Sequence, residues 1–446
     1  MVSTDDNQSY VDTTAARLGV SPDSLITTSR AAIQNTLQAY NIGVTHFGAQ
    51  DEEYDAFVIS YFQTLLMRDE IQVRQQPVLF DKRSSQYPVE AFVTGICPNC
   101  LDATCGGICE TCGHPNQCID LLGLNKDQYE ILVEPRLVLD LEKYRPELDE
   151  YLLAMTSHRP ALLRLITALL SRPLAPFVLS YKTDRGISAA FAGLPDQTLN
   201  AWGEMYPGHI CFLQRSAGPL SGDDEYIQFL GFDNSYFYVC AHSAMAIAAR
   251  RNGFNWPIPR AFLTNQFYYL DSYKFSTSKG HAVWASELAK QFNPDIIRLF
   301  LALHGPEYQE ANFVTGSFTR TATMLAASIN RVVDAYNSMR QAHPPPQKYP
   351  NEIAAVMGRP LELSGYSSAQ LASRCLNCLH YIHHLLSSGD RTFLTYVPGL
   401  VSLCLEVFCP VYADALKRRL DMTANTWQAI VASSPHVALP TFEVAR

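Results

Sequence analysis

Apolar residues recur at helical spacing along several parts of the chain. Between Asp55 and Met67 they fall on what would be one face of a helix. Ser21 and Pro22 mark another helix start, because serine caps helix N-termini and proline suits the first helical position. From Ala285 to the C-terminus the pattern is mostly helical, interrupted by the proline-rich linker 343–346. The C-terminal part is therefore predicted to be α-helical.

A strand–helix–strand pattern occupies residues 226–270. The apolar runs YIQFLGF, YFYVC and AFLTNQFYYL accompany one helical stretch, SAMAIAARR. Residues 126–172 are predicted to be helical from the apolar positions of LVLDLEKY and YLLAMT. Prolines, glycines and short apolar runs in 173–225 predict strands and loops, and residues 1–95 mix both patterns. We therefore predict an α/β protein.

The composition is that of a soluble globular protein. The chain has 446 residues, of which 47% are apolar and 17% charged, and its length suggests two or three domains. No apolar run approaches the roughly 18 residues of a membrane span, and MVSTDDNQSY lacks the basic and apolar regions of a signal peptide. We expect a cytoplasmic protein. The net charge of −9 argues against general nucleic-acid binding but leaves room for a local basic patch.

Paired cysteines predict a structural zinc site. Cys97 and Cys100 form one CxxC turn, and Cys109 and Cys112 form a second after eight intervening residues. Four thiolates at tetrahedral geometry satisfy zinc, and each CxxC turn presents two of them. Cys105 and Cys118 lie near enough to compete as ligands. The alternative is a cluster of cysteines without metal.

A second group, Cys375 and Cys378 followed by three histidines (His380, His383 and His384), is interpreted as part of a helix. Its cysteines are expected to pack as small apolar groups, and no metal is assigned to them.

Residues 274–280, KFSTSKG, suit a polyphosphate ligand. Lysines supply mobile positive charge, and hydroxyls and backbone amides donate to phosphate oxygens. Exposed loops of this composition are common, so the loop alone does not decide the function. Its position between the strand–helix–strand unit and the helical part strengthens the interpretation.

Together these segments resemble class I methionyl-tRNA synthetases, in family order and over almost the whole chain. VSTDDNQSYVDTTAARLGVSPDSL resembles the segment after the second Rossmann strand, and FVTGICPNC…CETCG resembles the zinc-bearing connective insertion. Residues 201–209, AWGEMYPGH, resemble the amino-acid pocket region, and FLGFDNSYFY resembles FIGKDxxYFH. KFSTSKG resembles the KMSKS loop, and ANFV with the helices after it resembles the anticodon-binding bundle.

The resemblance implies a Rossmann-type doubly wound sheet with a zinc-binding insertion and a C-terminal helical bundle. It divides the chain into the residual N-terminal half of the catalytic domain (1–90), the zinc knuckle (91–125), the rest of the insertion with the amino-acid pocket region (126–225), the second Rossmann half (226–273), the KMSKS-like loop with a stem-contact region (274–312) and the helical anticodon-binding-like domain (313–446).

The resemblance also implies an ATP-dependent ligase that makes an aminoacyl adenylate and transfers the acyl group to tRNA, with Mg²⁺ beside ATP and a structural Zn²⁺. Nucleotide contacts are expected from Gly231, Asp233, Lys274, Ser276, Ser278 and Lys279. Lys274, Thr277 and Lys279 occupy the catalytic loop positions. The amino-acid pocket would be lined by Trp202, Met205, His209, Phe237 and Tyr238. Trp202 and Phe237 are alternatively ordinary core aromatics.

Two departures concern catalysis. The chain begins at the segment that follows the HIGH motif in the family, so the HIGH element and the central first strand are expected to be missing. We expect an upstream segment or a partner chain to supply that strand. Thr277 stands where the family usually has the second KMSKS lysine, and Lys279 is near enough to compensate.

Two further departures concern specificity. Met205 and Tyr206 replace the usual Ala-Pro, and Tyr238 replaces a histidine, so the substrate is predicted to be smaller than methionine, such as glycine or alanine. Asp334 and Ser338 stand where the anticodon-reading Asn and Arg are usual, if the helical register is right. Two alternatives follow: a paralog that acylates a small amine or hydroxylamine, as in natural-product or hydrazine biosynthesis, and an inactive binding subunit.

Overall fold

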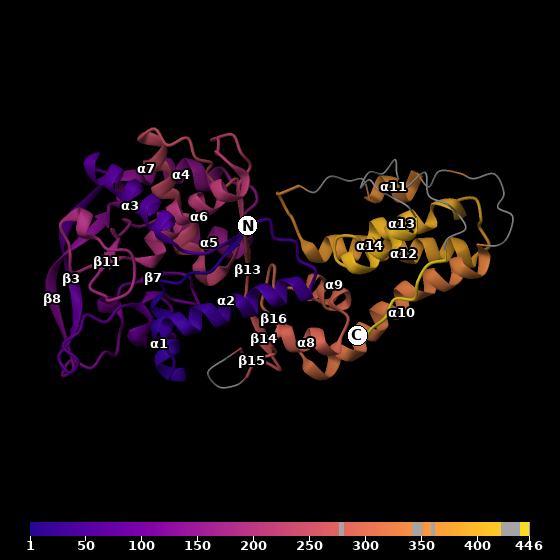
Figure 1. The fold of residues 1–446 in the computed structure, drawn as a ribbon, viewed down its shortest axis with the longest axis horizontal. Helices are drawn as coiled ribbons and strands as arrows, with labels where there is room; N and C mark the ends of the chain where they lie inside the picture. Colours follow the sequence, from indigo (N-terminus) through magenta and orange to yellow (C-terminus); the bar gives the residue numbers. More distant parts are fainter. Residues whose placement is uncertain (276–280, 341–347, 349–350, 358–361, 421–437, 446) are drawn as a thin grey trace. The chain divides into compact units, whose positions relative to one another are not determined.

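The computed structural model describes residues 1–275, 281–340, 348, 351–357, 362–420 and 438–445 (Figure 1). The chain forms two compact units. The first comprises residues 1–31 and 44–266, and the second comprises residues 32–43 and 267–446. The predicted 343–346 linker lies outside the described residues.

Parallel strand pairs form the Rossmann part of the first unit. Strand β1 (Val2–Ser3) pairs with β2 (Phe47–Gly48), and β12 (Ile227–Gly231) pairs with β13 (Ala261–Asn265). A π-helical turn and helix α7 (His242–Arg251) connect β12 to β13, which confirms the predicted strand–helix–strand unit. Within the described residues, the two pairs are separate sheets. A strand supplied from upstream or from a partner chain stays a prediction.

A long antiparallel ribbon carries the insertion. Strand β3 (Ile71–Asp81) pairs along its whole length with β8 (Tyr129–Leu139), and β9 (Phe177–Val178) joins the end of β8. The prediction of helices throughout 126–172 was therefore wrong over β8. Leu137, Val138 and Leu139 are buried in succession, and such an unbroken apolar run does not distinguish a strand from a helix. The rest of that prediction holds, because helices α4 (Arg145–Ala154) and α5 (Pro160–Leu170) follow.

Helix α6 (Ala201–Ala217) corrects the prediction of strands and loops for 173–225. Its proline and glycines suggested a loop, but Asn200 caps the helix by accepting a hydrogen bond from the Trp202 N–H at 3.0 Å. A side chain at Gly208 would collide with Tyr54 of α3 (Glu52–Met67), so the glycine permits close helix packing. The strands of this segment are short. They are β9 and the antiparallel pair β10 (Ser180–Tyr181) and β11 (Thr198–Leu199).

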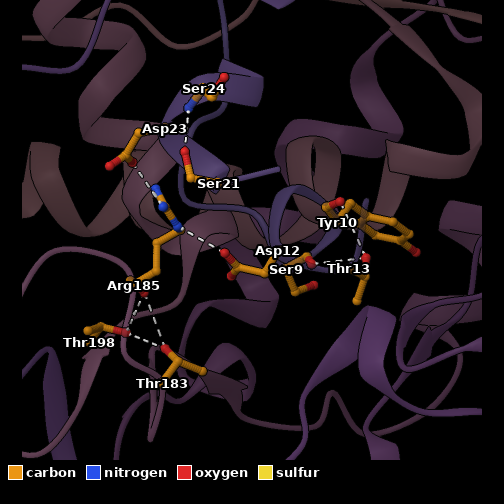
Figure 2. Close-up of polar contacts among 10 residues, drawn as sticks. All are labelled: Ser9, Tyr10, Asp12, Thr13, Ser21, Asp23, Ser24, Thr183, Arg185 and Thr198. Atoms are coloured by element: carbon orange, nitrogen blue, oxygen red, sulfur yellow. Dashed lines mark hydrogen bonds and ion pairs between the residues drawn. The ribbon is translucent and has the colours of Figure 1, made fainter. Parts of the chain in front are cut away.

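Helices α1 (Ser9–Leu18) and α2 (Pro22–Ala39) follow β1. The predicted start of α2 is confirmed, since the Ser24 N–H donates to the Ser21 hydroxyl at 3.2 Å. Arg185 joins these helices to the insertion by ion pairs of 3.0 Å to both Asp12 and Asp23 (Figure 2). The start of α2 is thereby held to the first unit.

The second unit is mostly helical, as predicted for the C-terminal part. Its small sheet has the order β15–β14–β16, with bounds Tyr273–Lys274, Tyr268–Leu270 and Ala311–Phe313. The helices are α8 (Ala285–Gln291), α9 (Pro294–His304), α10 (Thr315–Met339), α11 (Asn351–Met357), α12 (Ser368–Ser387), α13 (Val397–Leu405) and α14 (Pro410–Arg419). Cys375 and Cys378 lie buried on α12, as expected of cysteines that pack as apolar groups. None of the described helices has the length and apolarity that a membrane crossing requires.

Candidate functional site

The four predicted zinc ligands converge in the knuckle between β3 and β8. The sulfur atoms of Cys97, Cys100, Cys109 and Cys112 all lie within 4.8 Å of one another. The Cys97–Cys112 sulfurs are 3.8 Å apart and the Cys100–Cys109 sulfurs 3.5 Å apart. Tetrahedral zinc with bonds of about 2.3 Å separates its sulfurs by about 3.8 Å. The geometry and the donor set both fit zinc.

The local backbone favours the thiolate form of Cys97 within this cluster. Burial acts to raise the pKa of Cys97, but backbone N–H groups of Cys100 and Asn99 lower it to about 7. Cys105 and Cys118, which were considered as competing ligands, lie outside the set of converging sulfurs. A side chain at Gly106 would collide with the Cys118 sulfur. Cys118 is therefore packed against Gly106.

The predicted amino-acid pocket residues form one aromatic cluster on α6 and the π-helical turn Tyr236–Ala241. Trp202 and Phe237 stack with their ring centroids 4.0 Å apart and their planes at 8°. Tyr238 stacks on His209 at 5.7 Å and meets the edge of Trp202 at 6.3 Å. Met205 is buried on the same helix and accepts a weak contact from the Gln8 amide at 3.9 Å. The structure thus brings this predicted set together.

Two histidines beside this cluster are held neutral. Burial lowers the pKa of His209 to about 4. His242 on α7, which the sequence did not single out, lies 5.0 Å from the Tyr238 ring and its Nε2 is 2.6 Å from the Trp202 carbonyl oxygen. Burial lowers the pKa of His242 to about 3. The cluster is consequently an uncharged aromatic surface at neutral pH.

A pair of buried carboxyl groups borders the aromatic cluster and was missed in the sequence. Glu204 is fully buried and accepts hydrogen bonds from Asn7 at 3.0 Å, Gln50 at 2.6 Å and Tyr54 at 3.2 Å. Burial, followed by the charge of Asp5, raises the pKa of Glu204 to about 8. Burial likewise raises the pKa of Asp5 to about 7, and Asp5 also acts on the pKa of Tyr238. The site therefore holds two carboxyl groups with raised pKa values beside an aromatic wall.

The predicted nucleotide residues fall in different parts of the chain. Gly231 ends β12, and a side chain there would collide with the Asp233 carboxylate, so glycine allows that carboxylate to fold back over the strand end. Lys274 lies exposed at the end of β15 in the second unit, with its ammonium 5.2 Å from the Phe267 ring centroid. Ser276, Thr277, Ser278 and Lys279 lie outside the described residues.

Parallel strands joined through a helix, a knuckle of four cysteines in an insertion and a following helical unit define a class I synthetase fold. The family described as tRNA synthetases class I (M) matches residues 1–334. The chain belongs to that family.

Known proteins agree with this assignment. The chain is 24% identical to methionine–tRNA ligase of Flavobacterium psychrophilum over 97% of its own length and 70% of that protein. It is 23% identical to methionine–tRNA ligase of Korarchaeum cryptofilum over 69% of its length and 58% of that protein. Methionyl-tRNA synthetase of Mycobacterium tuberculosis, solved with methionyl-adenylate, has the same fold with a TM-score of 0.74 at 17% identity, covering 98% of this chain and 90% of that one. The chain spans between 52% and 70% of the length of the first curated ligases that it matches.

Proposed function

We propose that the protein activates an amino acid with ATP and transfers the acyl group to an acceptor, with tRNA as the first candidate. The observation that carries the proposal is the placement of Asp233 and Phe237 on consecutive helical turns after β12. One turn follows the glycine that ends a parallel strand, where nucleotides bind in doubly wound sheets. The next turn supplies the wall of an aromatic pocket. A nucleotide and an amino acid bound there would be neighbours.

In the proposed reaction, a carboxylate oxygen of the amino acid attacks the α-phosphorus of ATP and pyrophosphate leaves. Asp233 would contact the ribose. By the resemblance to the KMSKS loop, Lys274, Thr277 and Lys279, together with the Mg²⁺ that accompanies ATP, would stabilise the charge that develops on the phosphates. A hydroxyl of the tRNA terminus then attacks the acyl carbon and AMP leaves. Asp5 and Glu204 offer a negative partner for the ammonium of the amino acid.

The substrate is proposed to be smaller than methionine, such as glycine or alanine. The ring centroids of Trp202 and Phe237 are 4.0 Å apart, so the two stacked rings leave no space between them for a substrate side chain. Met205 and Tyr206 are buried on the adjoining turn, where Ala-Pro is usual in the family. Tyr206 packs against Tyr61 and Trp256 and adds bulk behind the pocket. A long side chain would have to separate the stacked rings.

A small amine or hydroxylamine is a second candidate acceptor. Asp334 is exposed on α10, where its carboxylate would repel a phosphate backbone. The Ser338 hydroxyl donates to the Ala335 carbonyl within the same helix at 2.8 Å, and a hydroxyl lacks the bidentate geometry of an arginine. Both features weaken anticodon recognition while leaving adenylate formation untouched.

Amino-acid-dependent exchange between ATP and labelled pyrophosphate tests the activation step in the full chain. Exchange stimulated by glycine or alanine supports the proposal, and absence of exchange with every amino acid rejects it. Transfer of the labelled acyl group to total tRNA or to hydroxylamine then separates the two acceptors. Acylated tRNA that forms in the absence of hydroxylamine favours tRNA as the acceptor. Product that forms only with the small amine favours the small amine as the acceptor.

A further inference from the structure

A cavity of about 130 Å³ lies in the first unit between the β3–β8 ribbon and the zinc knuckle. Gln76 and Leu79 of β3, Arg136 of β8 and Asn116 of the knuckle line it, and Phe177 and Phe237 close its apolar side. Trp202, Met205 and His209 of the aromatic cluster are not among the lining residues. The cavity is therefore a different space from the proposed amino-acid pocket, although Phe237 borders both. A cavity of roughly 150 Å³ holds benzene in another protein, so this one suits a compact molecule.

Arg136 is buried in the cavity wall without an acidic partner. Arg136 is only 2% exposed, and its Nη1 donates to the neighbouring Pro135 carbonyl at 2.9 Å. The nearby carboxylate of Glu134 is already paired with Lys182 at 2.7 Å and accepts from the Tyr87 hydroxyl at 2.8 Å. Among the described residues, no carboxylate lies within ion-pair distance of the Arg136 guanidinium. A buried guanidinium with most of its N–H donors unused is a ready site for a carboxylate.

Glu90 supplies a carboxyl group, whose pKa burial raises to about 7. It is 5% exposed, its Oε2 accepts from the Ser9 hydroxyl at 3.0 Å, and its Oε1 is buried with no hydrogen-bond partner in the described structure. Its φ of 42° is unusual for a residue with a side chain, and strained residues of this kind cluster at ligand sites. Gly107, which also lines the cavity, leaves room for Glu90, because a side chain at that position would press on its Cγ at 3.3 Å.

Asn116 adds a neutral donor. It is 1% exposed, its Oδ1 faces the Cys97 sulfur at 3.9 Å, and its Nδ2 is buried without a partner among the described residues. Buried polar groups are nearly always satisfied, so the unpaired Glu90 oxygen and Asn116 amide nitrogen of two residues that line one cavity indicate a missing partner. A ligand with both an acidic and a basic end would satisfy Arg136 and Glu90 together.

We propose that this cavity binds a small zwitterion of the amino-acid class. Its carboxylate would face the guanidinium of Arg136 and the amide of Asn116, its ammonium would face the free oxygen of Glu90, and its carbon body would lie against Phe177 and Phe237. This site goes beyond the proposed adenylation, which uses the Trp202 side of Phe237. It requires neither ATP nor the phosphate loop.

Calorimetric titration of the full chain without ATP tests the proposal. The probes are a series of small L-amino acids, together with the matching carboxylic acids that lack the amine and the matching amines that lack the acid. At least one amino acid is expected to bind at least tenfold more tightly than both of its truncated counterparts. Equal binding of an amino acid and its amine-free acid, or no binding of any amino acid, would overturn the proposal.

Substitutions then locate the bound molecule. Arg136→Met and Glu90→Gln are each expected to weaken binding at least tenfold, and Arg136→Lys, which retains the charge, less so. Arg74→Met is the matched control, because Arg74 is the cross-strand partner of Arg136 on β3 but pairs with Asp140 outside the cavity. Undiminished binding in Arg136→Met and Glu90→Gln would place the ligand elsewhere and reject the site. Pyrophosphate exchange measured in parallel distinguishes this outcome from failure of the adenylation proposal, since exchange does not depend on Arg136.

Discussion

The carboxyl groups of Asp5 and Glu204 have the clearest consequence for the stability of the folded protein. Asp5 follows β1 and Glu204 lies on α6, where Asn7, Gln50 and Tyr54 surround Glu204 with donors. Burial raises the pKa of both carboxyl groups, and the charge of Asp5 raises that of Glu204 further.

The raised pKa values of these two carboxyl groups predict a pH-dependent stability. The pKa values of Asp5 and Glu204 are raised to about 7 and about 8, so the folded chain binds protons more readily than the unfolded chain. Their contribution is fully present below the unfolded values near pH 4 and is lost as the pH rises through the folded values. The free energy of unfolding should fall between about pH 5 and pH 8, by up to ~1.4 kcal/mol per pH unit for each group. Urea denaturation at a series of pH values measures it. Asp5→Asn should flatten the profile, and a wild-type profile that is flat or rises over this range contradicts the raised pKa values.

Asn200 joins the cap of α6 to the neighbouring strands. Besides capping Trp202, its amide donates to the Val178 carbonyl at 2.7 Å and to the Tyr181 hydroxyl at 3.2 Å. Asn200→Ala should destabilise the first unit by about 2 kcal/mol, because a cap and buried hydrogen bonds are lost together. Ser338→Ala, which removes one exposed hydrogen bond, should cost less than about 0.5 kcal/mol. Denaturation curves that show equal effects for the two variants would contradict the role given to Asn200.

Lys279 is predicted to supply the cation that Thr277 lacks. Lys279→Ala should lower amino-acid-dependent pyrophosphate exchange by about 10²–10³, the loss typical of removing one group that stabilises the transition state. Lys290→Ala, an exposed lysine paired with Glu287 on α8, is the control and should exchange normally. Full exchange by Lys279→Ala would show that Lys279 does not compensate.

At the scale of elements, the zinc knuckle shows what a sequence can reveal directly. Each pair of ligands lies within its own CxxC turn, so the separation of two cysteines in the sequence already brings their sulfur atoms close together. The segments β8 and α6 show the opposite case. Burial of the last four residues of β8 removed the alternation expected of a strand there, and Pro207 with Gly208 suggested a loop where α6 packs against α3. In both elements tertiary contacts, rather than local pattern, decide the secondary structure.

Loss of one ligand should dismantle the knuckle. Cys109→Ser is expected to reduce bound zinc from one atom per chain towards none and to expose residues 94–118 to proteolysis, because the short strands there have little core of their own. Cys105→Ser should retain zinc, since Cys105 lies outside the converging set. Elemental analysis and limited proteolysis measure the two effects. Full zinc content in Cys109→Ser would exclude the assigned ligands.

At the scale of the whole molecule, the family could be predicted from the sequence, because several short motifs resemble those of the family in the same order along the chain. The aromatic cluster of Trp202, Phe237 and Tyr238 was found in this way. Asp5, Glu204 and His242 were not, since their significance arises only from burial and from neighbours distant in the chain. The lining of the second cavity was missed for the same reason.

The central claim is that this chain forms an adenylate with an amino acid smaller than methionine. Exchange of labelled pyrophosphate into ATP, measured with the full chain and a size series from glycine through alanine and valine to methionine, tests it most directly. The account predicts exchange that is strongest with glycine or alanine and declines with side-chain size. Exchange that is strongest with methionine, or that no amino acid stimulates, would contradict it.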